Sequence, residues 1–221
     1  PRRNSAALKL QLIYKQIMMD ARIKYSVLLV GIGLILAFLP FNAAKSFRLK
    51  PTELLSKSTS EDIYFSVDQV ARFMNNEDST VQIIDVRSAK QFRESNIPGS
   101  INIPFSDLLN PLWQPTLNQK EVKNIFYGNA DQTASYAWTI ATGLGYPNNF
   151  IMKGGLNEWF KTVMNSQFSG EKITPAENAR FEARLNARRT FTQINSLPDS
   201  LKTRFFNAKM LKESMLDGGC E

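Results

Sequence analysis

The sequence has no histidine and only one cysteine, Cys220, and these two shortages exclude several kinds of enzyme site. Without histidine, neither a Ser-His-Asp triad nor a Cys-His pair has its general base. A zinc site built from cysteine and histidine is excluded for the same reason. A single cysteine cannot close a disulfide within the chain. We therefore expect no metal site and no cofactor, and we name no catalytic residue.

The excess of positive charge lies mainly at the amino-terminal end. The 221 residues carry 27 Lys and Arg against 20 Asp and Glu, a net charge of +7. Six positive charges and one negative charge fall in residues 1–25, whereas residues 26–170 carry twelve of each sign. Basic residues directly before an apolar run are typical of a membrane topology signal, not of a phosphate-binding surface. We therefore expect no nucleic-acid partner.

Residues 25–44 form a long stretch without charge, YSVLLVGIGLILAFLPFNAA. As a helix it is about 30 Å long, at a rise of about 1.5 Å per residue, which spans the hydrocarbon core of a bilayer. The sequence therefore predicts one transmembrane helix in contact with the lipid bilayer. A cleaved signal peptide is the alternative, with Phe-Asn-Ala-Ala as a weak match to a cleavage site.

The residues around this stretch predict its orientation. Residues 1–24 are basic and partly amphipathic, which suits a helix at the membrane surface. Their charge favours a cytoplasmic amino terminus and an exported domain, although Lys45, Arg48 and Lys50 follow the stretch. We expect a protein of the bacterial inner membrane whose main domain lies in the periplasm.

The rest of the chain divides into a linker at residues 45–60, a domain at residues 61–168 and a helical carboxyl-terminal extension at residues 169–221. Within the domain, short apolar runs alternate with helical patterns, which is typical of an α/β fold with a parallel sheet flanked by helices. Strands are predicted at 81–85, 100–103, 124–127 and 149–152, and helices at 88–94, 134–143 and 155–163.

Four motifs in this domain resemble those of rhodanese-like domains. They are IIDVRS at 83–88, NIPGSINIP at 96–104, GY at 145–146, and MKGG at 152–155 followed by Trp159. Their order and spacing cover about residues 62–165 and imply a rhodanese-like fold. In such a fold Asp85 and Arg87 hold the loop after their strand, and the glycine pair permits a tight strand-to-helix turn.

The loop that would carry the chemistry departs from the family pattern. Active rhodaneses end the fourth strand in C-x-x-x-x-R-[ST], where the cysteine carries a persulfide and loop amides hold an anion. The corresponding residues here are Gly128, Asn129, Ala130, Asp131, Gln132, Thr133 and Ala134. Glycine replaces the cysteine and threonine replaces the arginine, so sulfur transfer by the family mechanism is not expected. Asp131 is interpreted as a cap of the following helix, and Asn96 stands where the family often has histidine.

The extension contains two predicted amphipathic helices. The first begins with a capping box formed by Thr174 and Glu177 around Pro175, and its apolar stripe contains Phe181 and Leu185. The second begins near residue 199 and has one apolar face formed by Leu201, Phe205, Ala208, Leu211 and Met215. These helices either pack on their own domain or dock onto a partner.

The function predicted from the sequence is a catalytically inactive, membrane-tethered module that binds or scaffolds the membrane proteins of a larger complex. The alternative is a module that binds sulfur oxyanions such as thiosulfate, or a residual sulfurtransferase that feeds a transporter. In that alternative, Cys220 beyond Gly218 and Gly219 could act as a mobile carrier thiol. The simpler interpretation is that Cys220 is incidental.

Overall fold

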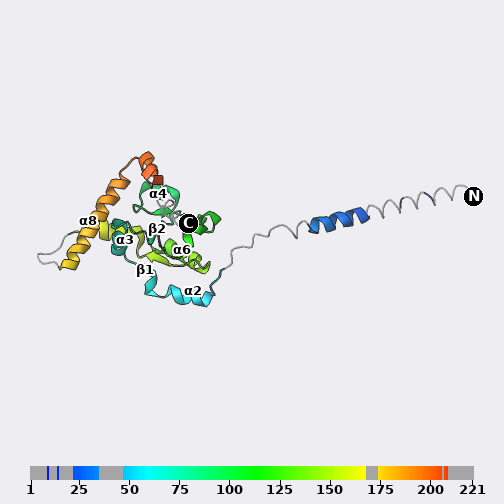
Figure 1. The fold of residues 1–221 in the computed structure, drawn as a ribbon, viewed down its shortest axis with the longest axis horizontal. Helices are drawn as coiled ribbons and strands as arrows, with labels where there is room; N and C mark the ends of the chain where they lie inside the picture. Colours follow the sequence, from blue (N-terminus) through cyan, green and yellow to red (C-terminus); the bar gives the residue numbers. More distant parts are fainter. Residues whose placement is uncertain are drawn as a thin grey trace, which may run out of the picture. The chain divides into compact units, whose positions relative to one another are not determined.

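The computed structural model describes residues 9, 14, 22–34, 47–167, 174–205 and 207–208 (Figure 1). The chain separates into two compact units, residues 1–44 and residues 45–221. In the first unit, residues 22–34 are helical and almost all of them are exposed. None of the helices described meets both requirements of a membrane span, about 20 residues of length and an apolar composition. Residues 35–44 of the predicted span lie outside the described residues.

The second unit is built on a sheet of five parallel strands, in the order β1-β5-β4-β2-β3. The strands are β1 (Tyr64–Phe65), β2 (Val81–Asp85), β3 (Ile101–Asn102), β4 (Lys123–Tyr127) and β5 (Asn149–Met152). Ile84 of β2 is opposite Ile101 of β3 and Phe126 of β4, so the central strands are in close register. The predicted parallel α/β fold is confirmed.

Helices connect these strands and cover both faces of the sheet (Figure 1). The α-helices are α2 (Pro51–Ser58), α3 (Val67–Asn75), α4 (Ala89–Glu94), α5 (Gln114–Leu117), α6 (Asp131–Gly143), α7 (Gly155–Trp159) and α8 (Pro175–Asn195). Short 3-10 helices span Glu61–Ile63, Phe105–Asp107 and Pro111–Trp113, and a π-helical turn, Phe160–Met164, continues α7.

Alternating side chains of the strands divide the core into two layers. Ile83 and Ile125 are buried in the layer formed with α3, α7 and α8. Their chain neighbours Ile84 and Phe126 are buried in the layer formed with α6 and the segment before β4. Because successive side chains of a strand point to opposite faces, an apolar run without alternation indicates a strand buried on both sides. The runs IID and IFY in β2 and β4 have this pattern.

The segment expected as a linker contains the helix α2, which packs against α6. The amides of Arg48 and Leu49 donate to the carbonyl oxygen of Gly143 at 2.7 and 3.3 Å. A β-carbon on Gly143 would lie 2.6 Å from the ring of Phe47, so this glycine permits the close approach. Within the predicted linker, residues 51–58 form a helix, and Leu54 packs against the core, while the division of the chain at residues 45–60 stays a prediction.

The carboxyl-terminal helix α8 packs on its own domain, against α3 and the π-helical turn. Its capping box of Thr174 and Glu177 is confirmed. The Nε and Nη2 atoms of Arg184 donate to the two carboxylate oxygens of Asp68 in α3, at 2.6 and 2.7 Å. The side chains that α8 buries most deeply are those of Ala187, Phe191 and Ile194. Phe181 and Leu185, the predicted stripe, are only half-buried.

The side-chain amide of Asn195 joins the end of α8 to the segment before β3. Its oxygen accepts the backbone N–H of Asn96 at 2.9 Å, and its nitrogen donates to the Asn96 carbonyl oxygen at 2.9 Å. One side chain therefore pairs with a backbone group in both directions, as a neighbouring strand would do. The contact joins residues that are 99 positions apart in the chain.

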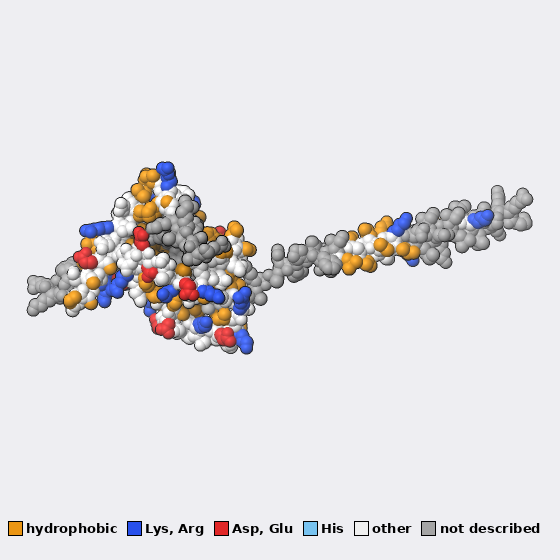
Figure 2. All heavy atoms as spheres, viewed as in Figure 1, with side chains coloured by type: hydrophobic (Ala, Val, Ile, Leu, Met, Phe, Trp, Pro, Cys, Tyr) orange, Lys and Arg blue, Asp and Glu red, His pale blue; other side chains and the backbone are white. Residues whose placement is uncertain are grey.

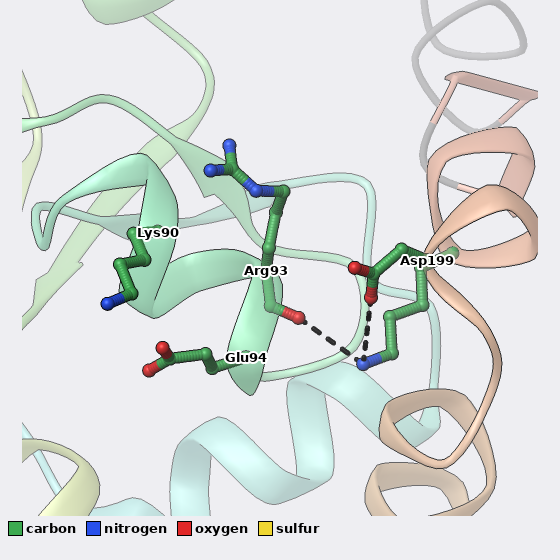
Figure 3. A pocket seen from close by; sticks show the side chains of 5 residues that line it. Lys90, Arg93, Glu94 and Asp199 are labelled. Carbon is green, nitrogen blue, oxygen red and sulfur yellow. Dashed lines mark hydrogen bonds and ion pairs between the residues drawn. The ribbon is translucent and has the colours of Figure 1, made fainter.

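Residues 199–205 form a further helical segment, which meets α4 around a surface pocket of about 440 Å³ (Figure 3). Lys90, Arg93, Glu94, Asp199 and Lys202 line this pocket. The Lys202 side chain is only 9% exposed, and its ammonium donates to the Arg93 carbonyl oxygen at 3.3 Å. A cation at the carboxyl end of a helix satisfies free carbonyl groups and the helix dipole. We therefore assign Lys202 a structural role.

The second predicted stripe is described only in part. Leu201 and Phe205 are 44% and 38% exposed. Residues 209–221, which include Leu211, Met215 and Cys220, lie outside the described residues. Among residues 199–205, the buried side chain is that of Lys202.

Tyr127, the last residue of β4, is completely buried and connects the sheet to the segment before β3. Its hydroxyl accepts the backbone N–H of Ile97 at 3.1 Å and lies 3.0 Å from the Ser100 hydroxyl. Burial, followed by the charge of Asp85, raises the pKa of Tyr127 well above its ordinary value of 10.0.

Replacing Asn195 by alanine should lower the free energy of unfolding by about 1–3 kcal/mol, because two partly buried backbone groups of Asn96 lose their partner. Asn186→Ala is the matched control, since Asn186 is exposed on the same helix. Chemical denaturation followed by circular dichroism measures both changes. Equal stability of the two variants would contradict the proposed importance of this contact.

The stability of the protein should fall as the pH rises above about 10. In that range an unfolded tyrosine loses its proton, whereas folded Tyr127 keeps it, so the unfolded state binds fewer protons. Tyr127→Phe should make the free energy of unfolding depend less steeply on pH in this range. The same variant should also lower that free energy by about 1–3 kcal/mol at neutral pH, because the Ile97 amide loses its acceptor. Tyr136→Phe, at an exposed tyrosine of α6, should leave the slope unchanged. Unfolding measured from pH 8 to pH 11 tests this.

Candidate functional site

The candidate site is formed by residues 128–133, called the loop below, which follow β4 at the carboxyl edge of the sheet and include the first turn of α6. In a parallel α/β sheet, ligands bind at this edge, in the loops that follow the strands. The loops after β2 and β5 start at the same edge, because both strands pair with β4 in the parallel direction. Residues 86–88 and 153–155 are therefore the neighbours of the candidate loop.

The first turn of α7 fixes the backbone of the loop. The amides of Leu156 and Asn157 donate to the carbonyl oxygens of Gly128 and Asn129, both at 2.9 Å. A β-carbon on Gly155 would lie 2.6 Å from the Gly128 oxygen, and the φ of Gly155 is +57°. Only glycine fits this combination of close approach and left-handed backbone. The predicted role of the glycine pair in a tight turn is confirmed.

Asp131 connects the loop to the turn after β5. Its carboxylate accepts a short hydrogen bond from the backbone N–H of Gly154. The N-cap of α6 is Ala130, and no side chain caps this helix end. The prediction that Asp131 caps its own helix is therefore wrong, because the carboxylate serves a tertiary contact instead. That contact places a negative charge within the loop, and this charge opposes the binding of an anion there.

Asp85 and Arg87 form a buried ion pair beside the loop. The Arg87 guanidinium donates to the Asp85 carboxylate at 2.6 Å through Nη2 and at 3.0 Å through Nε. The same group donates to the Ser95 carbonyl oxygen at 2.6 Å and to the Asn129 side-chain oxygen at 3.4 Å. Burial would lower the pKa of Arg87, but the hydrogen bond and charge of Asp85 outweigh it, so the pKa is raised. The expected structural role of the pair is confirmed.

Gly128 occupies the position of the family cysteine and is buried. Its φ lies outside the left-handed region, so the backbone does not require glycine here. A β-carbon at this position would lie 3.3 Å from the Ala130 oxygen and 3.5 Å from the Thr133 β-carbon. Such a contact needs a shift of only a few tenths of an ångström. A side chain at position 128 therefore depends on a small movement of the Ala130 backbone.

The remaining predicted residues contribute no reactive group. Asn129, Ala130 and Gln132 are exposed, and Thr133 is half-buried. Asn96, at the position of the family histidine, is buried and donates from its side chain to the Phe92 carbonyl oxygen at 2.8 Å. Within the described ranges, no three Cys, Asp or Glu side chains are grouped closely enough to hold a metal ion.

Sequence reasoning missed Asn195 and Ser95, which position the neighbours of the loop. Ser95 contributes only its carbonyl oxygen to Arg87, and a backbone contact leaves no signal in the sequence. Asn195 holds the next residue, Asn96, from a helix far along the chain. The extension is therefore linked to the loop through Asn96, Ser95, Arg87 and Asn129.

Comparison with known proteins gives a consistent family assignment. Residues 66–162 match the family described as the rhodanese-like domain. The thiosulfate:glutathione sulfurtransferase of Saccharomyces cerevisiae is 28% identical over 120 residues, which cover 49% of this chain and 85% of that protein.

Similar solved structures have low sequence identity to this chain. The single-domain sulfurtransferase RDL2 of Saccharomyces cerevisiae is 24% identical, with 47% of this chain and 92% of that chain covered and a TM-score of 0.40. The rhodanese-like domain of an Anabaena protein is 17% identical, with 51% and 91% covered and a TM-score of 0.40. The match to the family over residues 66–162 carries the assignment: this part of the chain is a rhodanese-like domain, related to sulfurtransferases.

Proposed function

We propose that this chain is a catalytically inactive rhodanese-like module that binds and scaffolds other proteins at a membrane. The observation that carries the proposal is Gly128, which stands at the nucleophile position of a loop whose backbone is otherwise well supported. A persulfide needs a thiolate, and glycine has no side chain to form one. No other residue of the loop carries a thiol.

Two further features of the loop support a binding role. Thr133 replaces the arginine that would attract an anion, and the Asp131 carboxylate adds a negative charge. The carbonyl oxygens of Gly128 and Asn129 are engaged by α7, so the loop is held as a rigid surface feature. A rigid, non-reactive loop at the ligand edge of the sheet suits recognition of a partner surface better than turnover of a substrate.

The membrane part of the proposal rests on the sequence of residues 25–44, which carries no charge over 20 positions. In this proposal the amino terminus lies in the cytoplasm and the rhodanese-like domain in the periplasm of a bacterium. The partners are membrane proteins of a larger complex.

A second candidate is residual sulfur transfer or the binding of a sulfur oxyanion. The similarity to a thiosulfate:glutathione sulfurtransferase favours it. Cys220 is the only thiol of the sequence and would have to carry the sulfur. A thiol that acts through a persulfide must reach an anion-stabilising site.

The purified protein should transfer no sulfur from thiosulfate to cyanide or glutathione. In the double variant Gly128→Cys, Thr133→Arg, the new thiolate should take the outer sulfur of thiosulfate and release sulfite, once the backbone shifts by the few tenths of an ångström that a β-carbon at position 128 needs. Mass spectrometry of the protein after thiosulfate treatment detects the added sulfur atom. Activity of the unmodified chain that is lost in Cys220→Ser would instead establish the second candidate.

The full-length chain, extracted in mild detergent, should co-purify with a defined set of membrane proteins in fixed stoichiometry. A variant in which residues 25–44 are exchanged for an unrelated apolar span of equal length should keep these partners, because the domain carries the binding. Quantitative mass spectrometry of both preparations measures this. A chain that is recovered alone from its native membrane would contradict the scaffold function.

A further inference from the structure

The exposed hydrophobic side chains of the domain are distributed unevenly over its two outer layers. Nine large hydrophobic residues of the described part of residues 45–221 are more than a third exposed. Six of them belong to elements that cover the α6 face of the sheet: Phe47, Leu55, Phe105, Leu109, Leu112 and Tyr136. Phe160, Leu201 and Phe205 lie elsewhere.

The six residues share one layer because their neighbours in the chain share one core cluster. Leu54, Leu108 and Trp113 pack into the cluster beneath α6, and each is adjacent to an exposed residue of the set. The opposite layer is largely covered by α8, which buries Phe191 there. The surface that carries these six residues is called the α6 layer below. Among the described residues, no helix covers the α6 layer as α8 covers the opposite one.

From this asymmetry we propose that the α6 layer rests on the surface of a lipid bilayer. The inference rests on the membrane tether of the proposed function. It adds which face of the domain meets the lipid. The parts that do so are residues 47–58, residues 105–113 and Tyr136 of α6.

The point where the chain enters the domain supports lipid as the partner of the α6 layer. The uncharged stretch ends at residue 44, and residue 47 already packs on α6, with Phe47 against Gly143. Three residues of extended chain reach at most about 10 Å. If residues 25–44 lie in a bilayer, this short connection keeps the domain within reach of the lipid surface.

The side chains of this layer have the chemistry of a membrane interface. Leu112 is 79% exposed and stands next to the half-buried Trp113, and Tyr136 is 53% exposed. Leucine inserts into the acyl boundary, while tryptophan and tyrosine favour the level of the headgroups.

The charges of the layer indicate how it would attach. Arg48, Lys50 and Lys57 are exposed at its amino-terminal side, where basic and hydrophobic side chains lie near one another around α2 (Figure 2). Glu53 and Asp107 lie in the same layer, so it is not strongly basic. Attachment therefore depends on inserted side chains more than on the charge of the lipid.

Spin labels at single cysteines test this orientation in the full-length chain. Starting from Cys220→Ser, the variants Leu112→Cys and Leu55→Cys place a label on the α6 layer. Arg189→Cys, on the exposed side of α8, is the matched control on the opposite layer. All three positions are exposed, so the labels should not disturb folding. The chain is reconstituted in phosphatidylcholine vesicles, and collision with oxygen and with a polar nickel complex gives the depth of each label.

The labels at positions 112 and 55 should lie about 5–10 Å inside the headgroup–acyl boundary, and the label at position 189 should lie in water. Vesicles with added phosphatidylglycerol should give the same depths. If the chain floats with the vesicles but either label of the α6 layer is as accessible to nickel as position 189, the orientation is wrong while the tether stands. If the chain does not float with the vesicles after an alkaline wash, the tether itself fails, and the inference fails with it.

Discussion

The buried charge of Arg87 constrains the whole carboxyl edge of the sheet. A guanidinium that is removed from water must have its hydrogen bonds satisfied, and breaking such a pair costs about 3–5 kcal/mol. Here the partners are the Asp85 carboxylate, the Ser95 carbonyl oxygen and the Asn129 side chain. These come from the end of β2, from the segment after α4 and from the loop after β4. One cation therefore fixes the positions of three segments, and Asn195 adds the extension to the same network through Asn96.

These contacts also explain how the loop keeps its backbone conformation with glycine at position 128. Its backbone is positioned by Arg87, by the amides of α7 and by the hydrogen bond from Gly154 to Asp131. None of these contacts involves a side chain at position 128. Glycine at that position is therefore compatible with the same fold, because the contacts that hold the loop come from other residues.

The strands and most helices of the domain could be predicted from the sequence, whereas their tertiary contacts could not. The strand at residues 149–152 was predicted to the residue, because a run this short, with turn residues on both sides, is too short for a helix. The two-residue strand β1 gives no periodic signal, and α2 resembles a polar linker because only Leu54 packs inward. Gly128 was located by motif spacing. The role of Asp131 depends on Gly154, 23 positions away, so local capping rules gave the wrong partner.

The extension also limits where a partner protein can approach the domain. α8 occupies the outer surface of α3 and the π-helical turn, and its Arg184 pair with Asp68 is half-buried between them. Lys202 and Asn195 then hold the following segment against α4 and the chain before β3. If lipid covers the α6 layer, the carboxyl edge with residues 128–133 is one surface that stays open to a protein. Ligands of parallel α/β sheets bind at this edge, so a partner of the proposed scaffold would meet the domain where such folds ordinarily hold a ligand.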